Sequence, residues 1–138
     1  MKTKIFEGPG KVVVEHDPNT RTYIANWSGY LGPHFREAVN AMIGAVKVSG
    51  IDSYIANASM ANDVPTQEDF RWGEEVFTAA LVAAGIRRFI TVVPTHAIAK
   101  LGANRFNKIA SNTPGVDTYR VASLTEALSI SRDPLDPK

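Results

Sequence analysis

The chain has no cysteine, no long run of charge of one sign and no uninterrupted apolar segment long enough to cross a membrane. The absence of cysteine excludes thiol catalysis, disulfides and thiolate metal sites, and it fits a reducing compartment. Fifteen Lys and Arg residues against fourteen Asp and Glu leave a net charge of +1. This balance offers no electrostatic footprint for DNA or RNA, so we expect no nucleic-acid partner.

Targeting signals are also scarce. The first residues, MKTKIFEGPGK, lack the apolar core of a signal peptide. The most apolar window, residues 76–93, is interrupted by Gly85 and by the pair Arg87-Arg88. We therefore expect no membrane span and a cytoplasmic location.

What the chain does contain is enough apolar sequence for one core. It has 138 residues, of which 44% are hydrophobic, and a chain of this size can build a core without metals or disulfides. We expect a single domain over residues 1–132, followed by a frayed C-terminal tail over residues 133–138.

The pattern of apolar residues predicts strands that alternate with helices. Residues 11–17 and 20–27 are β-branched or alternating segments around a Pro-Asn turn and predict an antiparallel hairpin, and residues 4–7 are a candidate edge strand. Helical spacing between Pro33 and Gly50, and from Pro65 or Thr66 to Gly85, predicts two helices. Further strands are expected over residues 52–58, 87–93 and 116–122, and further helices after Thr95 and from Ser123.

The resulting order is ββαβαβαβα. Strands that alternate with helices favour a mostly parallel, mixed sheet of four or five strands covered by about four helices. The fold class predicted from the residues is α/β.

Four segments carry a resemblance to a known family: WSGYLGPHFREAVNAM, VPTQEDFRW, AAGIRRFITVVP and SLTEALS. They occur in the order seen in SpoIIAA-like proteins of the STAS-type domain superfamily, which the chain resembles over nearly its whole length. The resemblance implies a mixed sheet with helices, no cofactor, no catalytic chemistry and action by protein docking. In related antagonists an Asp-x-Ser precedes a serine phosphoacceptor, whereas here Asn57 and Ser59 are followed by the stretch MANDVPT, which contains Thr66 and no serine.

Open α/β sheets place ligands beyond the carboxyl ends of their strands. The residues expected there are Asn57, Ser59, Asp63 and Thr66 after one strand, and Thr95 and His96 after the next. Ser59, His96 and Asp63 could be combined into a catalytic triad, but no Gly-x-Ser-x-Gly elbow surrounds the serine. The three histidines show no metal-ligand spacing. We expect no enzyme, no metal and no cofactor.

Two residues of the second expected helix have two interpretations each. Thr66 is either a helix cap or a phosphoacceptor. Trp72 falls off the apolar stripe of the helix, so it either docks a partner or packs against a neighbouring element.

A set of basic residues farther along the chain also has two interpretations. They either hold an anion or form a solvated face, and they are Arg87, Arg88, Lys100, Arg105 and Lys108.

The leading hypothesis is a non-enzymatic STAS-like regulatory or protein-interaction module, with a homodimer as one form. It would bind its partner through the second helix and the loop from Asn57 to Thr66. The alternative is a module that binds a small apolar molecule or a lipid in a crevice between the helices and the sheet. The alanine-rich segment FTAALVAAG suggests this second hypothesis.

Overall fold

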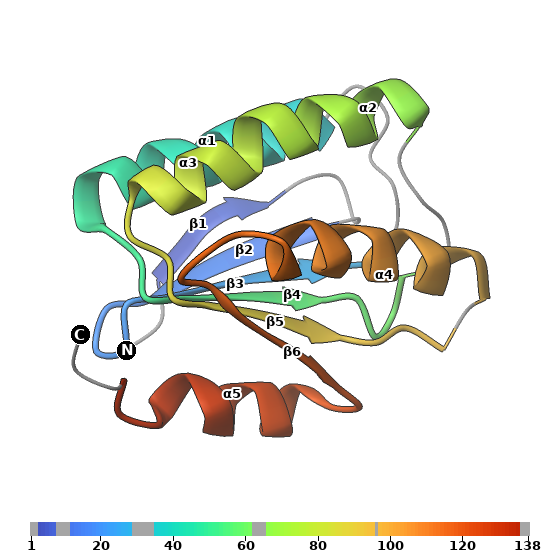
Figure 1. Cartoon of the computed structure of the whole chain (residues 1–138). Coiled ribbons are helices and arrows are strands. Elements are labelled where there is room, and N and C mark those ends of the chain that lie inside the picture. The colour runs from blue at the N-terminus through green and yellow to red at the C-terminus, as the bar shows by residue number, and fades with distance from the viewer. Residues whose placement is uncertain (1–2, 8–11, 29–34, 62–65, 96, 136–138) are drawn as a thin grey trace.

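The computed structural model describes residues 3–7, 12–28, 35–61, 66–95 and 97–135, and it leaves out some side chains between residues 97 and 109. Pro33, Asp63, Pro65 and His96 lie outside the described residues. In chain order the elements are β1 (Thr3–Glu7), β2 (Val12–Asp17), β3 (Thr22–Trp27), α1 (Phe35–Ser49), β4 (Ser53–Asn57), α2 (Gln67–Trp72), η2 (Gly73–Phe77), α3 (Thr78–Ala83), β5 (Arg88–Val92), α4 (Ala97–Ser111), β6 (Asp117–Val121) and α5 (Leu124–Arg132) (Figure 1).

The strands form one mixed sheet in the order β1-β2-β3-β4-β5-β6. β1, β2 and β3 pair antiparallel, and β3 to β6 pair parallel. The α/β class and the N-terminal hairpin are therefore confirmed. The expected four or five strands are too few, because Thr3–Glu7 forms a sixth strand despite a shift of its register between Lys4 and Phe6.

About four helices were expected, and the described residues form five α-helical segments and one π-helical segment, three of which are parts of one expected helix. The helix expected between Thr66 and Gly85 consists of α2, η2 and α3, which follow one another without a break. In η2 the backbone N–H of Thr78 donates to the carbonyl of Gly73, five residues earlier. This wider turn is characteristic of a π-bulge inside a longer helix.

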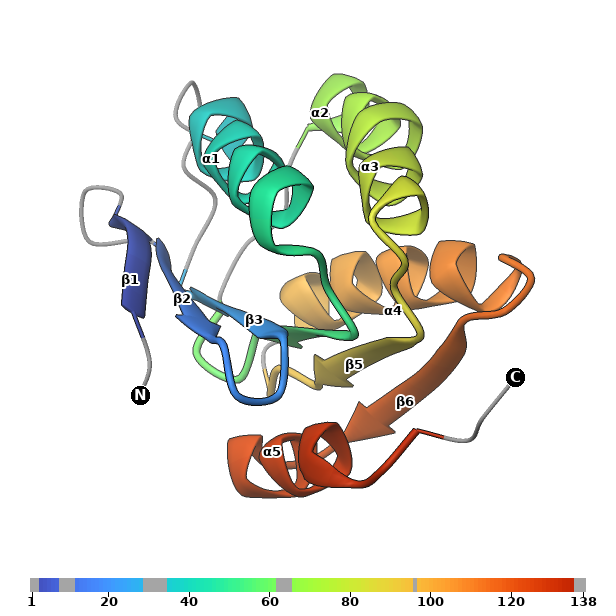
Figure 2. The ribbon, with the colours of Figure 1, turned by 90° about the vertical axis from the view of Figure 1, so that its left-hand side faces the viewer.

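The helices cover the sheet unequally. α1, α2–α3 and α4 lie on one face, and α5 lies on the other (Figure 2). α5 contacts β4, β5 and β6. Each crossover helix returns from the carboxyl end of one strand to the amino end of the next. α1, α2 and α4 therefore begin near the carboxyl edge of the parallel strands.

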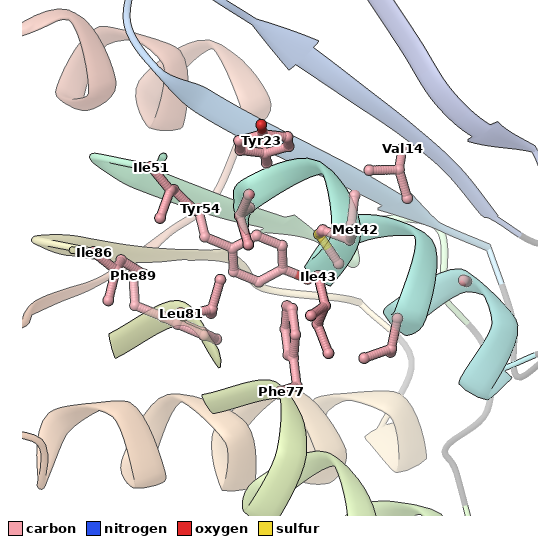
Figure 3. Close-up of a cluster of buried hydrophobic side chains, with 14 of the residues drawn as sticks. Val14, Tyr23, Met42, Ile43, Ile51, Tyr54, Phe77, Leu81, Ile86 and Phe89 are labelled. Carbon is pink, nitrogen blue, oxygen red and sulfur yellow. The ribbon is translucent and has the colours of Figure 1, made fainter. Parts of the chain in front are cut away.

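Each face of the sheet has its own apolar core. Met42 of α1, Phe77 of η2 and Leu81 of α3 pack with Tyr54 and Phe89 of the sheet (Figure 3). The Tyr54 ring lies edge-on to the rings of Phe77 and Phe89, with centroid distances of 5.2 and 5.1 Å. On the opposite face Ile24, Ile55, Ile90 and Val92 pack against Ala127 of α5. All of β5 is buried, as expected for a parallel strand covered on both sides.

The helix boundaries follow the local sequence signals. Gly50 and Gly85 stop the helices before them with positive φ angles of 73° and 96°, a conformation that glycine adopts without steric cost. Ser123 caps α5, since its side chain accepts a hydrogen bond from the N–H of Glu126. These expectations from sequence are confirmed.

Candidate functional site

The parallel strands β3, β4 and β5 end at one edge of the sheet, as the sequence predicts for a site. The backbone N–H of Ala58 donates to the carbonyl of Val92, so the segment after β4 stays tied to β5. The next backbone bond, from Ala61 N–H to the Ala58 carbonyl, closes a turn around Ser59 and Met60. The chain that carries the candidate contacts is thus fixed at its base.

A row of polar side chains crosses this edge on the face that α5 partly covers. Asn26 and Asn57 are register partners on β3 and β4, and Asn57 Nδ2 donates to Asn26 Oδ1 at 2.7 Å. Ser59 Oγ donates to Asn57 Oδ1 at 2.8 Å, and the Ser59 N–H points to the same oxygen at 3.3 Å. At the other end Asn26 Nδ2 donates to Glu15 Oε1 at 3.1 Å. We call Glu15, Asn26, Asn57 and Ser59 the polar row.

The direction of these bonds decides what the polar row can do chemically. Each group donates to the next, from the Ser59 hydroxyl to the Glu15 carboxylate. A serine nucleophile needs a neighbouring base that accepts its proton, whereas the amide oxygen of Asn57 is not a base at neutral pH. The polar row therefore supplies no base that would activate the Ser59 hydroxyl.

The opposite face of the same edge is aromatic. The rings of Trp27 and Phe35 are tilted with centroids 5.8 Å apart, and Phe35 meets Trp72 edge-on at 6.3 Å. The guanidinium of Arg36 lies over the Trp72 ring, 5.1 Å from its centroid, at a distance typical of a cation–π contact. Trp72 is half-buried by these residues, which corresponds to its packing interpretation.

Trp27 also reaches into the core. It forms a side-chain hydrogen bond with Tyr54, which is buried in the hydrophobic core. Burial raises the pKa of Tyr54 well above its ordinary value, and the bond to Trp27 opposes this shift only in part. Tyr54 therefore stays neutral at physiological pH and serves packing rather than acid–base chemistry.

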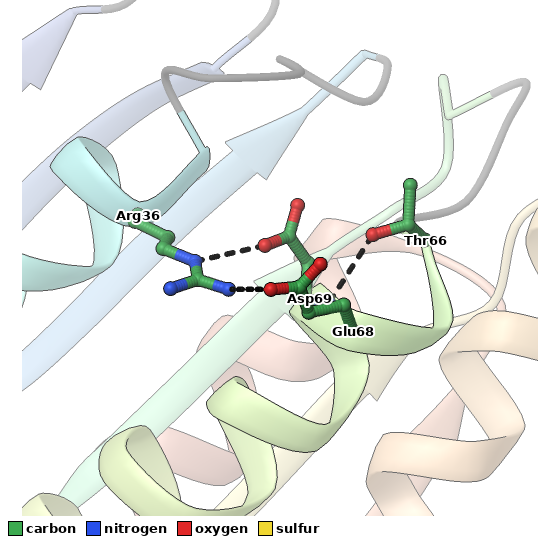
Figure 4. Close-up of polar contacts among 4 residues, drawn as sticks. All are labelled: Arg36, Thr66, Glu68 and Asp69. Atoms are coloured by element: carbon green, nitrogen blue, oxygen red, sulfur yellow. Dashed lines mark hydrogen bonds and ion pairs between the residues drawn. The ribbon is translucent and has the colours of Figure 1, made fainter.

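The start of α2 is joined to α1 by charge. Arg36 Nε donates to Asp69 Oδ1 at 2.9 Å, and Arg36 Nη2 lies 3.7 Å from Glu68 Oε1 (Figure 4). Thr66 Oγ1 accepts from the N–H of Asp69 at 3.2 Å. The cap expected of Thr66 is confirmed, and Thr66 itself is exposed. Asp69 has little exposure, so its ion pair with Arg36 is shielded from solvent more than the pair with Glu68.

The candidate residues fall into separate groups at this edge. Asn57 and Ser59 belong to the polar row, whereas Thr66 and Trp72 lie on the helical side. Thr95 follows β5 and is exposed. Asp63 and His96 lie outside the described residues, so the structure does not test whether they come together with Ser59.

Several residues at this edge are missing from the sequence-based selection. Met60 is 77% exposed, and among the described residues Val48 and Leu101 are exposed to a similar degree, at 88% and 73%. An apolar residue inside a polar loop is the signal that could have identified it. Asn26 could have been identified because β3 and β4 each carry an asparagine near their carboxyl end, Asn26 and Asn57, and these two residues are register partners. Glu15 contacts the site because of the register between β2 and β3, and Arg36 because α1 packs against α2. The sequence carries no local signal for either contact.

The described residues contain no group of three His, Cys, Asp or Glu side chains that could hold a metal ion. Within the same part of the chain, no helix has the length and apolarity needed to cross a membrane. Comparisons with models of known protein families, with curated proteins and with solved structures find no match to this chain. A function can therefore be inferred only from the residues and their geometry.

Proposed function

We propose that this chain is a non-enzymatic protein-interaction module, similar to the SpoIIAA-like proteins, that binds a protein partner at the carboxyl edge of its sheet. The observation that carries the proposal is the exposure of Met60 in a turn held between two backbone hydrogen bonds. An exposed apolar side chain in a preorganised turn loses little conformational entropy when a partner covers it. Cytoplasmic location belongs to the same proposal, because the chain lacks cysteine.

The polar row supports recognition rather than catalysis. Ser59 precedes Met60 directly, and the hydroxyl proton of Ser59 is committed to Asn57. The outward lone pairs of Ser59 Oγ can accept a hydrogen bond from a partner while Met60 supplies apolar contact. Polar groups around an apolar centre are the usual composition of a protein-binding patch.

The test is site-specific photo-crosslinking in the native cell. A photoreactive amino acid at position 60 should give a discrete adduct, and the matched control carries the same residue at position 48. Val48 is 88% exposed, but it lies in the last turn of α1, near the amino edge of the parallel strands. A discrete adduct from position 60 that position 48 does not give supports the proposal. Equal adducts from both positions, or none from position 60, would contradict it.

Substitution then tests the contact itself. Met60→Glu should weaken binding of the crosslinked partner at least tenfold, because a carboxylate would have to be desolvated in an apolar contact. Val48→Glu should leave binding unchanged. Circular dichroism and thermal unfolding of both variants provide the control for an intact fold. If the adduct contains a second copy of this chain, its mass identifies a homodimer.

The alternative function, binding of a small apolar ligand between the helices and the sheet, is disfavoured because side chains already fill this space. Met42, Tyr54, Phe77 and Leu81 are buried between α1, η2–α3 and the sheet (Figure 3). A lipid in this place would have to separate α1 from α3, at the cost of the contacts between these side chains. Native mass spectrometry of the purified chain decides between the two ideas. A bound mass that survives desalting favours the ligand module, and the bare chain mass favours the interaction module.

A further inference from the structure

A second polar feature lies at the opposite edge of the sheet, where β5 and β6 begin. The residues around it enclose a hollow of about 180 Å³. Its lining comes from Arg87, Arg88, Gly115, Asp117, Tyr119, Pro134 and Leu135. The segment after α5 runs back to this place, beside the start of β6 (Figure 2). The hollow is separate from the carboxyl edge of the sheet.

The central group of the hollow is a buried cation. Arg88 is 6% exposed, and its guanidinium donates to three backbone carbonyls. Nη1 donates to Ile130, and Nη2 donates to Asp133 at 2.7 Å and to Pro134 at 3.3 Å. These bonds use three of the five N–H groups of the guanidinium. Residues 133 and 134, which the sequence predicts to lie in a frayed tail, are thereby held against β5.

Among the described residues, no carboxylate lies within ion-pair distance of this cation. Asp117 is the register partner of Arg88 on β6, yet within the described part of the chain Arg88 forms no ion pair with it or with any other acid. The positive charge is offset by carbonyl dipoles at the end of α5, which are neutral groups. A buried charge without a counter-ion is costly, and an anion beside it lowers that cost.

We propose that the hollow binds a small oxyanion, of the size of inorganic phosphate or a short carboxylate. Arg88 and Arg87 supply the positive wall, and the Arg88 N–H groups not used on the α5 carbonyls are the donors. A volume of this order holds about six water molecules at about 30 Å³ each, which is room enough for such an ion. Asp117 opposes a second negative charge on the ligand, so the monoanion is preferred.

The experiment is a titration of the isotopically labelled full chain with inorganic phosphate and, separately, with acetate, at constant ionic strength in chloride. Backbone amide shifts should saturate and should be confined to residues 87–88, 115–119 and 133–135. Selective saturation by phosphate identifies a phosphoryl ligand, and selective saturation by acetate identifies a carboxylate. Shifts that rise linearly, or that spread over the whole chain, would overturn the proposal.

Three variants test whether the anion binds in the hollow. Arg87→Gln should weaken binding about tenfold, and Asp117→Asn should tighten it about threefold to tenfold, because each removes one charge near the ion. Arg71→Gln is the matched control, since Arg71 is exposed on α2 on the other face of the sheet, and it should change nothing. Equal weakening by Arg87→Gln and Arg71→Gln would show a general charge effect and would refute the site. Arg88 itself is not substituted in this test because it supports the fold.

Discussion

Substitution of Arg88 by methionine tests how the C-terminal helix is held. Methionine keeps much of the side-chain length and the apolar stem but removes the guanidinium. The carbonyls of Asp133 and Pro134 then lose the guanidinium as donor, and the Ile130 carbonyl keeps only its bond from the Asp133 N–H. All three lie at a helix end, where backbone acceptors lack full pairing within the helix. The expected consequence is local opening of α5 together with a loss of global stability.

The size of the loss follows from two opposing effects. Hydrogen bonds to a charged group contribute about 1.5–3 kcal/mol each, so three of them give roughly 5–9 kcal/mol. Removal of the buried cation regains several kcal/mol of desolvation free energy. We expect a net loss of about 2–4 kcal/mol in the free energy of unfolding. At about 3 °C per kcal/mol for a chain of this length, the Tm should fall by about 6–12 °C.

Urea unfolding and amide hydrogen exchange measure the two parts of this prediction. In Arg88→Met, exchange should accelerate in α5 more than in β3 or β4, because opening of the helix does not require the whole sheet to unfold. Arg132→Met is the matched control, since Arg132 is an exposed residue in the last turn of the same helix, and it should change stability by less than about 0.5 kcal/mol. A loss below about 1 kcal/mol for Arg88→Met, or unchanged exchange in α5, would refute the reasoning.

Three further substitutions test single contacts. Asn57→Asp should cost about 1–2 kcal/mol at pH 7, because a carboxylate cannot donate to Asn26; the folded state raises its pKa, so the loss should shrink in urea titrations at pH 4. Burial lowers the pKa of His16, so stability should fall as pH drops below about 6.5; His16→Phe, which keeps the stack on Tyr23, should remove that slope in thermal scans. Thr66→Ala should cost about 1 kcal/mol by urea unfolding, while Thr66→Ser should restore most of it.

The elements of this fold could be predicted because their signals are local. Gly50 and Gly85 end helices, Thr66 and Ser123 begin them, and the apolar runs between them are strands. These features depend on backbone conformation and hydrogen bonds within a few residues. The sixth strand lay at the limit of such signals, since Thr3–Glu7 is short and partly exposed, and its pairing depends on β2.

The π-helical segment is a feature that a helical wheel does not represent. A helical wheel assumes the same rotation for every residue, and on it Trp72 falls off the apolar stripe. Gly73–Phe77 instead forms a wider turn, so the phase of the helix changes directly after Trp72. The contacts of Trp72 with Phe35 and Arg36 come from the packing of α2 on α1, which no pattern within one helix encodes.

The sequence predicted the edge of the sheet at which the candidate site lies, but it did not predict all of the residues that form the polar row. Asn57 and Ser59 were identified because parallel strands end at a common edge. Their partners depend on register: Asn26 is opposite Asn57, and Glu15 reaches Asn26 from the neighbouring antiparallel strand. A shift of one residue in either pairing would turn these side chains to the other face, so the polar row could not be derived from spacing alone.

The two proposed sites occupy opposite edges of the same strands, and this distance predicts that they act independently. The parallel strands β4 and β5 each have five residues, which corresponds to about 16 Å at about 3.3 Å per residue. Substitutions farther apart than about 7–10 Å and without shared contacts usually have additive effects. Met60→Glu should therefore leave anion binding unchanged, and Arg87→Gln should leave partner binding unchanged. If either substitution altered the other site, the sheet would transmit a signal between its edges, and β4 and β5, buried between the two cores, would be the elements that carry it.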